Sequence, residues 1–227
     1  MRHVTRNLTD ENYQRINQAV ATAESTTSVE IVPVVAAVSG RYDRQEDIVG
    51  LWAAVGALTV TWSLLPADTT PGDWGALPSW ARMVFLLLSV VLGFVAGAVV
   101  GARVDWLRSL FTPPEQKRDE VLSRARQVFF DSRVHHTAGR TGLLIYVSLF
   151  ERMASVLADG AVVEKLGQPA LDELRDHLTA GLRARPLVDA LCDTIAAAGP
   201  RLATVLPRLE TDINELPDAL VVLDRPL

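Results

Sequence analysis

The sequence contains a single cysteine, no excess of positive charge and, in two long stretches, no charged residue at all. Cys192 alone can form neither an internal disulfide nor a cysteine-based zinc site, and its apolar neighbours predict a small buried side chain. The net charge of -5 argues against a general nucleic-acid-binding protein. These absences exclude disulfide scaffolds and zinc ribbons, and we expect no nucleic-acid partner.

The two uncharged stretches are residues 48–66, which number 19, and residues 83–102, which number 20. About 20 apolar helical residues match the roughly 30 Å hydrocarbon core of a bilayer, and a backbone in lipid satisfies its own hydrogen bonds by forming a helix. Core helices of soluble proteins carry a polar stripe, which both stretches lack. We therefore predict a transmembrane hairpin over residues 48–102 rather than a buried hairpin in a soluble core. All five tryptophans lie within or beside it, four of them near the expected membrane interfaces: Trp52, Trp62, Trp74, Trp80 and Trp106.

The arrangement of arginines around the hairpin predicts its orientation. Arg41 and Arg44 precede the first stretch, and Arg103 and Arg108 follow the second, whereas the link over residues 67–82 holds only Arg82. Positive residues favour the cytoplasmic side, so both termini are expected in the cytoplasm of a two-span protein of the cytoplasmic membrane. We expect no cleavable signal in the polar N-terminal region, so the first stretch is expected to direct insertion itself.

Small residues recur along both predicted spans. Gly93, Gly97 and Gly101 repeat every fourth residue in the second span, which allows another helix to approach closely. That helix is either the first span or the same glycine face in a second copy of the chain, as a homodimer. The first span offers a matching narrow face: Gly50, Ala53, Ala54 and Ala57. Neither span contains an ionisable group, so we expect an anchor in the lipid bilayer rather than an ion or proton pathway.

Residues 1–40 and 106–227 carry the composition of an ordinary soluble domain, split by the hairpin. Residues 29–38 are nearly all apolar and β-branched, which predicts a strand covered on both faces, and residues 143–150 predict another. Because two spans return the chain to the side it left, these strands can pair in one sheet as an interrupted β-α-β unit. Pro33 lacks a backbone donor and predicts an edge position or a bulge.

Helical periodicity accounts for most of the remaining soluble sequence. Thr9 is expected to cap a helix that ends near Glu24. A second helix begins at Pro113-Pro114, with a buried face of Val121, Leu122, Ala125, Val128 and Phe129. Leucines at helical spacing predict a helix over residues 171–185, and another over residues 187–199 ends at Gly199-Pro200. Residues 153–157 predict a short strand, and residues 220–223 either a final strand or simple packing.

Three segments together resemble one known family. The opening helix LTDENYQRINQAV, the strand SVEIVPVV and the strand-turn-strand RTGLLIYVSLFERMASVLAD are similar to the TPM domain, over most of residues 7–38 and 114–206. The likeness is greatest to membrane-bound bacterial members with a transmembrane pair inserted in the domain. It implies an α/β fold, an αβα sandwich around a small mixed sheet, in proteins tied to membranes. Some plant members are acid phosphatases, and others are assembly or maintenance factors for membrane complexes.

The resemblance also marks candidate site residues. By position, Glu151 and Arg152 match the family's acidic/arginine turn, and Asp159 matches its following acidic position. The family's glycine-rich acidic segment is not reproduced, since GAVVEKLG stands there. This departure disfavours a calcium or phosphatase role.

Histidines and arginines near these positions complete the candidate chemistry. His135 and His136, with Asp159, are candidate ligands of a divalent metal, and Arg140 or Arg152 of a phosphate. Their spacing matches no standard metal motif, and surface loop residues or a salt bridge across the turn are the ordinary explanation. Ser148 lacks a nucleophile-elbow sequence around it.

Two hypotheses about function follow. The first, which we favour, is a non-catalytic interaction or assembly factor anchored in the membrane by the hairpin. The alternative is a membrane-anchored, metal-dependent acid phosphatase with Glu151 and Asp159 as its metal or acid/base groups. They differ in whether the carboxylates and histidines converge in one open cleft. Neither a substrate nor a partner protein is predicted by the sequence.

Overall fold

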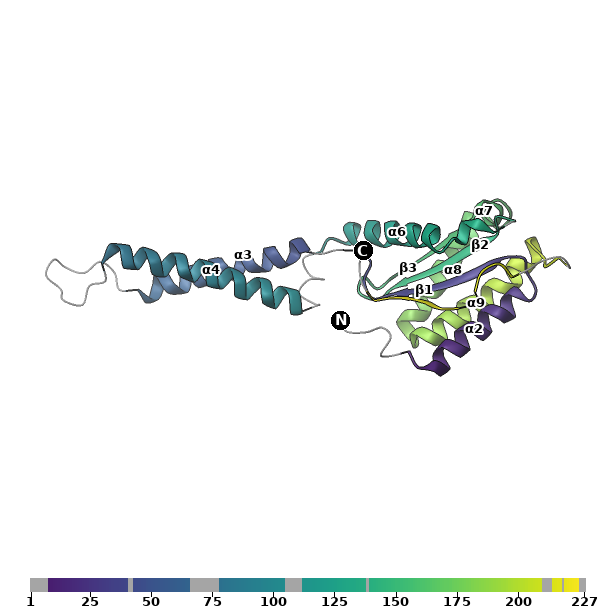
Figure 1. Cartoon of the computed structure of the whole chain (residues 1–227), viewed down its shortest axis with the longest axis horizontal. Coiled ribbons are helices and arrows are strands. Elements are labelled where there is room, and N and C mark those ends of the chain that lie inside the picture. The colour runs from purple at the N-terminus through teal and green to yellow at the C-terminus, as the bar shows by residue number, and fades with distance from the viewer. Residues whose placement is uncertain are drawn as a thin grey trace. The chain divides into compact units, whose positions relative to one another are not determined.

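The computed structural model describes residues 8–40, 43–65, 78–104, 112–137, 139–209, 214–217 and 219–224. The chain divides into two compact units (Figure 1), which are treated separately below. The α/β unit comprises Met1–Gly40 and Pro114–Leu227, and the hairpin unit comprises Arg41–Pro113. The predicted start of the second soluble segment, residue 106, lies outside the described residues, as does most of the link over residues 67–82.

The hairpin unit contains two helices, α3 (Asp43–Leu64) and α4 (Ser79–Arg103). Both are long and apolar enough to span a membrane. The helices contain the predicted spans, except for residue 65, which follows α3, and residue 66, which is not described. Each helix also begins a few residues before its predicted span, because polar residues can extend a helix without entering the apolar stretch.

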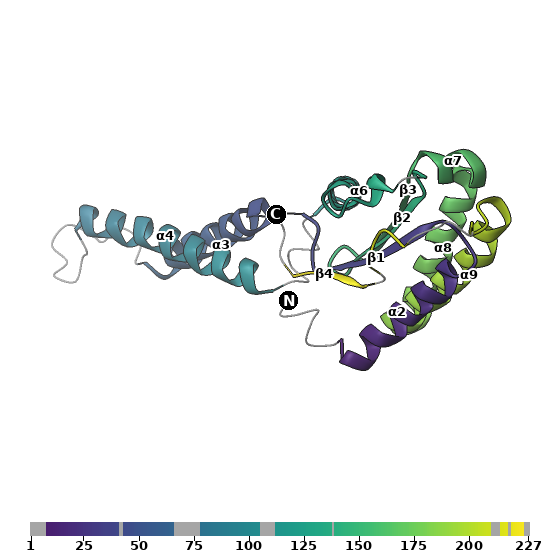
Figure 2. The ribbon, with the colours of Figure 1, turned by 45° about the vertical axis from the view of Figure 1, so that its right-hand side comes forward.

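The α/β unit is built on a four-stranded sheet with the strand order β3-β2-β1-β4. The strands are β1 (Glu30–Ala36), β2 (Gly142–Ser148), β3 (Met153–Ala158) and β4 (Val221–Leu223). β1 pairs in parallel with β2 and β4, and β3 pairs antiparallel with β2 (Figure 2). The predicted pairing of strands on either side of the hairpin is confirmed, in the register Glu30 with Gly142 through Ala36 with Ser148.

Helices cover both faces of the sheet, so the α/β unit is an αβα sandwich around a small mixed sheet, as expected. On one face lie α2 (Asp10–Glu24), α8 (Gln168–Ala184) and α9 (Leu187–Val205), and on the other lies α6 (Pro114–Asp131). Along β1, Ile31 and Val35 pack against the layer formed by α2, α8 and α9, while Val32 and Val34 pack against α6. This alternation follows from the two-residue period of a strand. A short helix, α7 (Gly160–Leu166), and a 3-10 turn, η1 (Val134–His136), complete the unit.

Most of the predicted helix faces are confirmed. The Thr9 side chain caps α2 by accepting a hydrogen bond from Asn12 N at 3.4 Å, and Ile16 and Val20 are fully buried. In α6 the prediction was wrong at Leu122, which is 38% exposed. Successive helical residues are about 100° apart, and this rotation carries Leu122 off the face that its neighbour Val121 buries.

Two predictions based on proline were also wrong. β1 is an interior strand, but β4 pairs with it only from Val34 onward, so β4 has not yet begun at Pro33. The N–H of Glu30 points toward β2 and that of Ala37 toward β4. Because this direction alternates along a strand, the nitrogen of Pro33 points to the β4 side. No ladder hydrogen bond is therefore lost there. Helix α9 continues through Pro200 to Val205 because Leu202, in its last turn, is fully buried in the core.

Candidate functional site

Glu151 lies in the turn between β2 and β3, and its side chain is buried. Its Oε1 accepts hydrogen bonds from the backbone N–H groups of Ser39, at 2.9 Å, and Gly40, at 3.2 Å. Its Oε2 accepts one from the hydroxyl of Ser148. The chain leaves the sheet at Ser39 and Gly40, where the strand ladder no longer supplies acceptors. The carboxylate of Glu151 therefore closes the carboxyl end of β1.

Three hydroxyl groups lead from the sheet to this carboxylate. Ser39 Oγ donates to Ser148 Oγ at 2.8 Å, and Ser148 donates to Glu151. A hydroxyl has one proton, so the 2.9 Å bond between Tyr146 and Ser39 must be donated by Tyr146. The result is a directed chain from Tyr146 through Ser39 and Ser148 to Glu151. Every hydroxyl in it has a partner, which is the condition for a buried polar network to be stable.

Tyr146 is fully buried at the start of this network. Burial raises the pKa of its phenol, while the neighbouring Ser39 hydroxyl and the positive charge of Arg124 act in the opposite direction. Arg124 is itself buried on α6 and donates to Gln127 at 3.2 Å. The sequence analysis did not single out Ser39, Arg124 or Tyr146. The available signal was Tyr146 and Ser148, two hydroxyls two positions apart and therefore on one face of an apolar strand.

Asp159 lies at the opposite end of β3 from Glu151. Its Oδ1 caps α7 by accepting from Gly160 N at 2.6 Å, and Arg140 Nη2 approaches the same oxygen at 3.8 Å. β3 has six residues, and a strand rises about 3.3 Å per residue, so the two carboxylates are on the order of 20 Å apart. The structure therefore does not bring the two candidate catalytic carboxylates together.

His135 and His136 lie in η1, which follows α6. Their rings meet edge to face at 4.9 Å between centroids, and His135 packs against Phe130 at the same separation. In the part of the chain that the structure describes, no group of three or more histidine, cysteine or acidic residues is positioned to hold a metal ion. The three candidate ligands His135, His136 and Asp159 thus do not form a metal site within the described residues.

Arg152 does not pair with Glu151 across the turn. It adopts a left-handed backbone conformation with φ 54°, and its side chain is exposed and lines a pocket beside the end of β2. Although the two residues are adjacent in the sequence, the carboxylate of Glu151 therefore lies in the buried hydrogen-bond network, whereas the side chain of Arg152 lies at the pocket.

In the hairpin unit, the glycine face of α4 packs on α3. A Cβ added at Gly93 would lie 2.7 Å from Ala57 Cβ, and one at Gly97 would lie 2.5 Å from Ala53 Cβ. The neighbours of Gly93 thus lie later in α3 than those of Gly97, as expected for antiparallel helices. Gly101 is also buried. The close approach predicted from the small residues is realised within one chain, so a homodimer through these glycines would have to replace these contacts.

Comparisons with known proteins identify the fold without assigning a function. No family model matches the sequence, and no curated protein is significantly similar. One solved structure is similar, the NMR structure of BA42 protein from the psychrophilic bacterium Bizionia argentinensis, with a TM-score of 0.56 at 18% sequence identity. The similarity covers 98% of this chain and 99% of that one. At this identity the likeness supports the α/β fold alone.

Proposed function

We propose that the protein is a membrane-anchored α/β domain of the TPM type that acts as a non-catalytic interaction or assembly factor at the cytoplasmic membrane. The observation that carries this proposal is the separation of the candidate catalytic groups. Glu151 and Asp159 flank β3 at its two ends, and both accept hydrogen bonds from backbone N–H groups. An acid/base or metal-assisted site needs such groups around a single reacting centre.

The surface of the hairpin unit supports the anchoring part of the proposal. Its buried positions are small residues such as Gly50, Ala54 and Gly97, whereas large apolar side chains lie on the outside. Contiguous exposed apolar surface on this scale needs a cover, and lipid supplies one around two helices of membrane-spanning length. With two antiparallel spans, both soluble segments lie on the same side, and the flanking arginines favour the cytoplasm.

The first test is hydrolysis of a generic phosphomonoester by the purified full chain, with and without Mg²⁺, Mn²⁺ or Ca²⁺. The proposal predicts no turnover above background under any of these conditions. Metal-stimulated turnover that Glu151→Gln and Asp159→Asn both abolish would overturn it in favour of the phosphatase. These near-isosteric substitutions keep an oxygen acceptor for the backbone N–H groups, so a loss of turnover would not simply report unfolding.

The second test concerns partner contacts in the membrane. Phe130 on α6 is 59% exposed beside His135, so a photo-cross-linking phenylalanine analogue placed there samples the surface of the α/β unit. A second position for the same cross-linking residue is Glu164, which is exposed on α7. The proposal predicts a discrete protein adduct from at least one of these surface positions after irradiation of native membranes. Absence of any adduct from both would count against an interaction role.

A further inference from the structure

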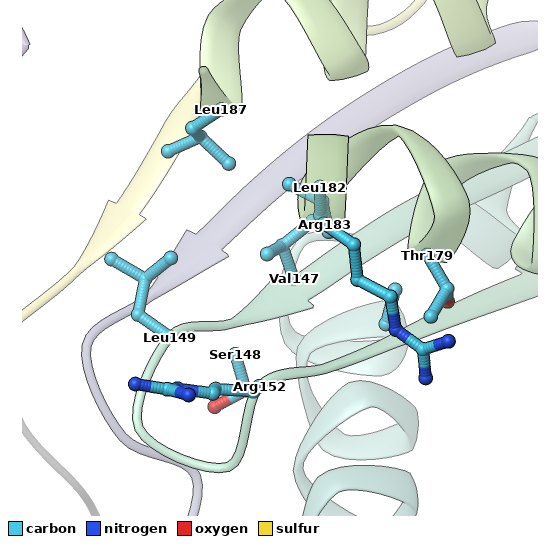
Figure 3. A pocket seen from close by; sticks show the side chains of 9 residues that line it. Val147, Ser148, Leu149, Arg152, Thr179, Leu182, Arg183 and Leu187 are labelled. Atoms are coloured by element: carbon cyan, nitrogen blue, oxygen red, sulfur yellow. The ribbon is translucent and has the colours of Figure 1, made fainter. Parts of the chain in front are cut away.

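A pocket of about 570 Å³ opens beside the carboxyl end of β2 (Figure 3). It lies between the β2–β3 turn, the last turns of α8 and the first residue of α9. Its apolar walls are Val147, Leu149, Ala154, Leu182 and Leu187. The volume lies within the range of small-molecule sites, about 300–1,000 Å³. Ligands of open α/β sheets commonly bind outside the carboxyl ends of the strands, which is the position of this pocket.

Among the residues that the structure describes, the charged ones that line this pocket are Arg152 and Arg183, and no acidic one lines it. Figure 3 shows their side chains reaching from two different elements, the β2–β3 turn and α8, with Ser148 and Val147 between them in this view. The carboxylate of Glu151 is engaged with Ser39, Gly40 and Ser148 and does not line the pocket. The described lining of the pocket therefore combines apolar walls with two positively charged side chains.

The other arginines on α8 and α9, and Arg185 between these helices, form ion pairs with acidic side chains. Arg175 pairs with Asp172 and Asp176 at 2.8 and 2.9 Å, and Arg201 pairs with Glu173 at 3.0 Å. Arg185 pairs with Asp193. Neither Arg152 nor Arg183 forms an ion pair or a side-chain hydrogen bond with any residue that the structure describes. Among the described arginines of the β2–β3 turn, α8 and α9, those without a carboxylate partner are thus the two that line the pocket.

The chemistry of this arrangement selects a class of ligand. A guanidinium presents several donors in a rigid fork that matches the oxygens of a phosphate or a carboxylate. Two such groups beside an apolar cavity favour a molecule that carries an oxyanion at one end and an apolar body at the other. We propose that this pocket binds a small amphiphilic oxyanion, a phosphate or carboxylate attached to an apolar chain or ring. This inference does not depend on the proposed interaction role.

The experiment measures binding of hexyl phosphate to the full chain in phosphatidylcholine nanodiscs by isothermal titration calorimetry, with empty nanodiscs as the blank. Wild-type protein is expected to bind it. Arg152→Gln and Arg183→Gln should each weaken binding about tenfold to hundredfold, because each removes charge-assisted hydrogen bonds. The matched control is Arg175→Gln, an ion-paired arginine on the same helix as Arg183, which should leave the affinity unchanged.

A second variant tests the pocket without changing its charge. Ala154 lies in the wall, so Ala154→Leu should fill part of the cavity and weaken binding while both arginines remain. The assignment would be overturned if hexyl phosphate bound with unchanged affinity both to Ala154→Leu and, separately, to the Arg152→Gln/Arg183→Gln double variant. A circular dichroism spectrum of each variant would verify that the fold is retained.

Three further probes define what the pocket recognises. If hexanoate binds with the same affinity as hexyl phosphate, the pocket accepts any oxyanion as the headgroup. If hexyl phosphate binds more tightly, the headgroup is a phosphate. Both outcomes support the proposal. Hexanol binding as tightly as the anions, or inorganic phosphate binding as tightly as hexyl phosphate, would each overturn it, since one half of the ligand would then be unnecessary. Absence of hexyl phosphate and hexanoate binding to wild type would also overturn it.

Discussion

The two units of this protein distribute their large apolar side chains in opposite ways. In the α/β unit, residues such as Ile16, Leu143 and Ile195 are fully buried. Among the described residues of α3 and α4, the buried positions are occupied by glycine and alanine, while Leu, Val, Phe and Trp side chains point outward. A soluble surface rarely exposes a continuous apolar patch of this extent. The contrast indicates that the two units are adapted to different surroundings.

The units also treat polar groups differently. Three buried glutamates in the α/β unit accept hydrogen bonds from backbone N–H groups near the sheet: Glu24 from Ile31, Glu30 from Glu215 and Leu216, and Glu151 from Ser39 and Gly40. The described residues of the hairpin unit include no buried acidic side chain. There, serine and threonine hydroxyls donate back to their own helix, as Thr59 does to Val55 O at 2.9 Å and as Thr194 does to Ala190 O in the α/β unit. Buried carboxylates thus supply acceptors for backbone N–H groups around the sheet, whereas the described hydroxyl hydrogen bonds of the hairpin helices lie within each helix.

The largest expected effect comes from placing charge on the outer face of α4. Leu88→Arg/Leu92→Arg puts two charges on one face near the middle of the proposed span, and each costs about 2.5–3.5 kcal/mol on insertion scales. The fraction of protein that resists alkaline carbonate extraction from membranes should fall to background. The matched pair Leu122→Arg/Leu209→Arg, on exposed positions of the α/β unit, should leave that fraction unchanged. Equal behaviour of the two pairs would remove the distinction between the units.

The next effect concerns Glu151 as a structural acceptor. Glu151→Ala leaves the buried N–H groups of Ser39 and Gly40 without this acceptor and should lower the free energy of unfolding by roughly 2–4 kcal/mol. Glu151→Gln should cost less, because its amide oxygen still accepts. Both values are measurable by urea unfolding of the purified chain followed by far-ultraviolet circular dichroism. Glu164→Ala, at an exposed position of α7, is the control, and a Glu151→Ala protein as stable as this control would contradict the assigned role.

A smaller effect is expected from Gly97 in the helix contact of the hairpin. Gly97→Val forces α3 and α4 apart and should lower hairpin stability by about 1–3 kcal/mol, the usual range for overpacking. An added Cβ at Gly56 would meet nothing within 4 Å, so Gly56→Val is a matched control for the same substitution on α3. Stability is followed by tryptophan fluorescence during titration with sodium dodecyl sulfate. If Gly97 served a homodimer instead, its substitution would reduce the dimer fraction and leave hairpin unfolding unaltered.

The smallest effect is a change in stability at alkaline pH. The pKa of Tyr146 is raised in the folded chain from its ordinary value of 10.0, chiefly by burial. Above this ordinary value the unfolded chain loses the phenolic proton while the folded chain keeps it, so stability falls as the pH rises toward the folded pKa. Tyr146→Phe should flatten this decline in urea unfolding measured between pH 8 and about 11. An identical slope in wild type and variant would show that Tyr146 does not titrate differently on folding.

The sequence predicted the architecture well because its strongest signals are local. Uncharged stretches of membrane-spanning length, the capping residue Thr9 and the apolar strand over residues 29–38 each carry their own information. The closing strand β4 was left undecided between a strand and simple packing, since its three residues resemble any short apolar segment. Helix α7 was not predicted, as its seven residues are too few to display a period.

The candidate site was predicted less well because it depends on contacts between distant residues. Glu151 was a candidate for catalysis from its position in a turn, but its carboxylate meets Ser39, which lies 112 positions away. Nothing near Glu151 in the sequence indicates that those N–H groups need an acceptor. Arg152 and Arg183 likewise line one pocket only because α8 packs beside β3.

The most direct test of the contrast between the two units uses the native tryptophans, because all five fall within Arg41–Pro113 and none in the α/β unit. Their fluorescence therefore reports on the hairpin unit alone, and Trp52, Trp62 and Trp80 are largely exposed there. The measurement is quenching of this fluorescence by lipids brominated along their acyl chains, in nanodiscs that contain the full chain. Our account predicts strong quenching relative to unbrominated lipid. Fluorescence that brominated lipid leaves unchanged, while an aqueous quencher such as acrylamide abolishes it, would contradict the account.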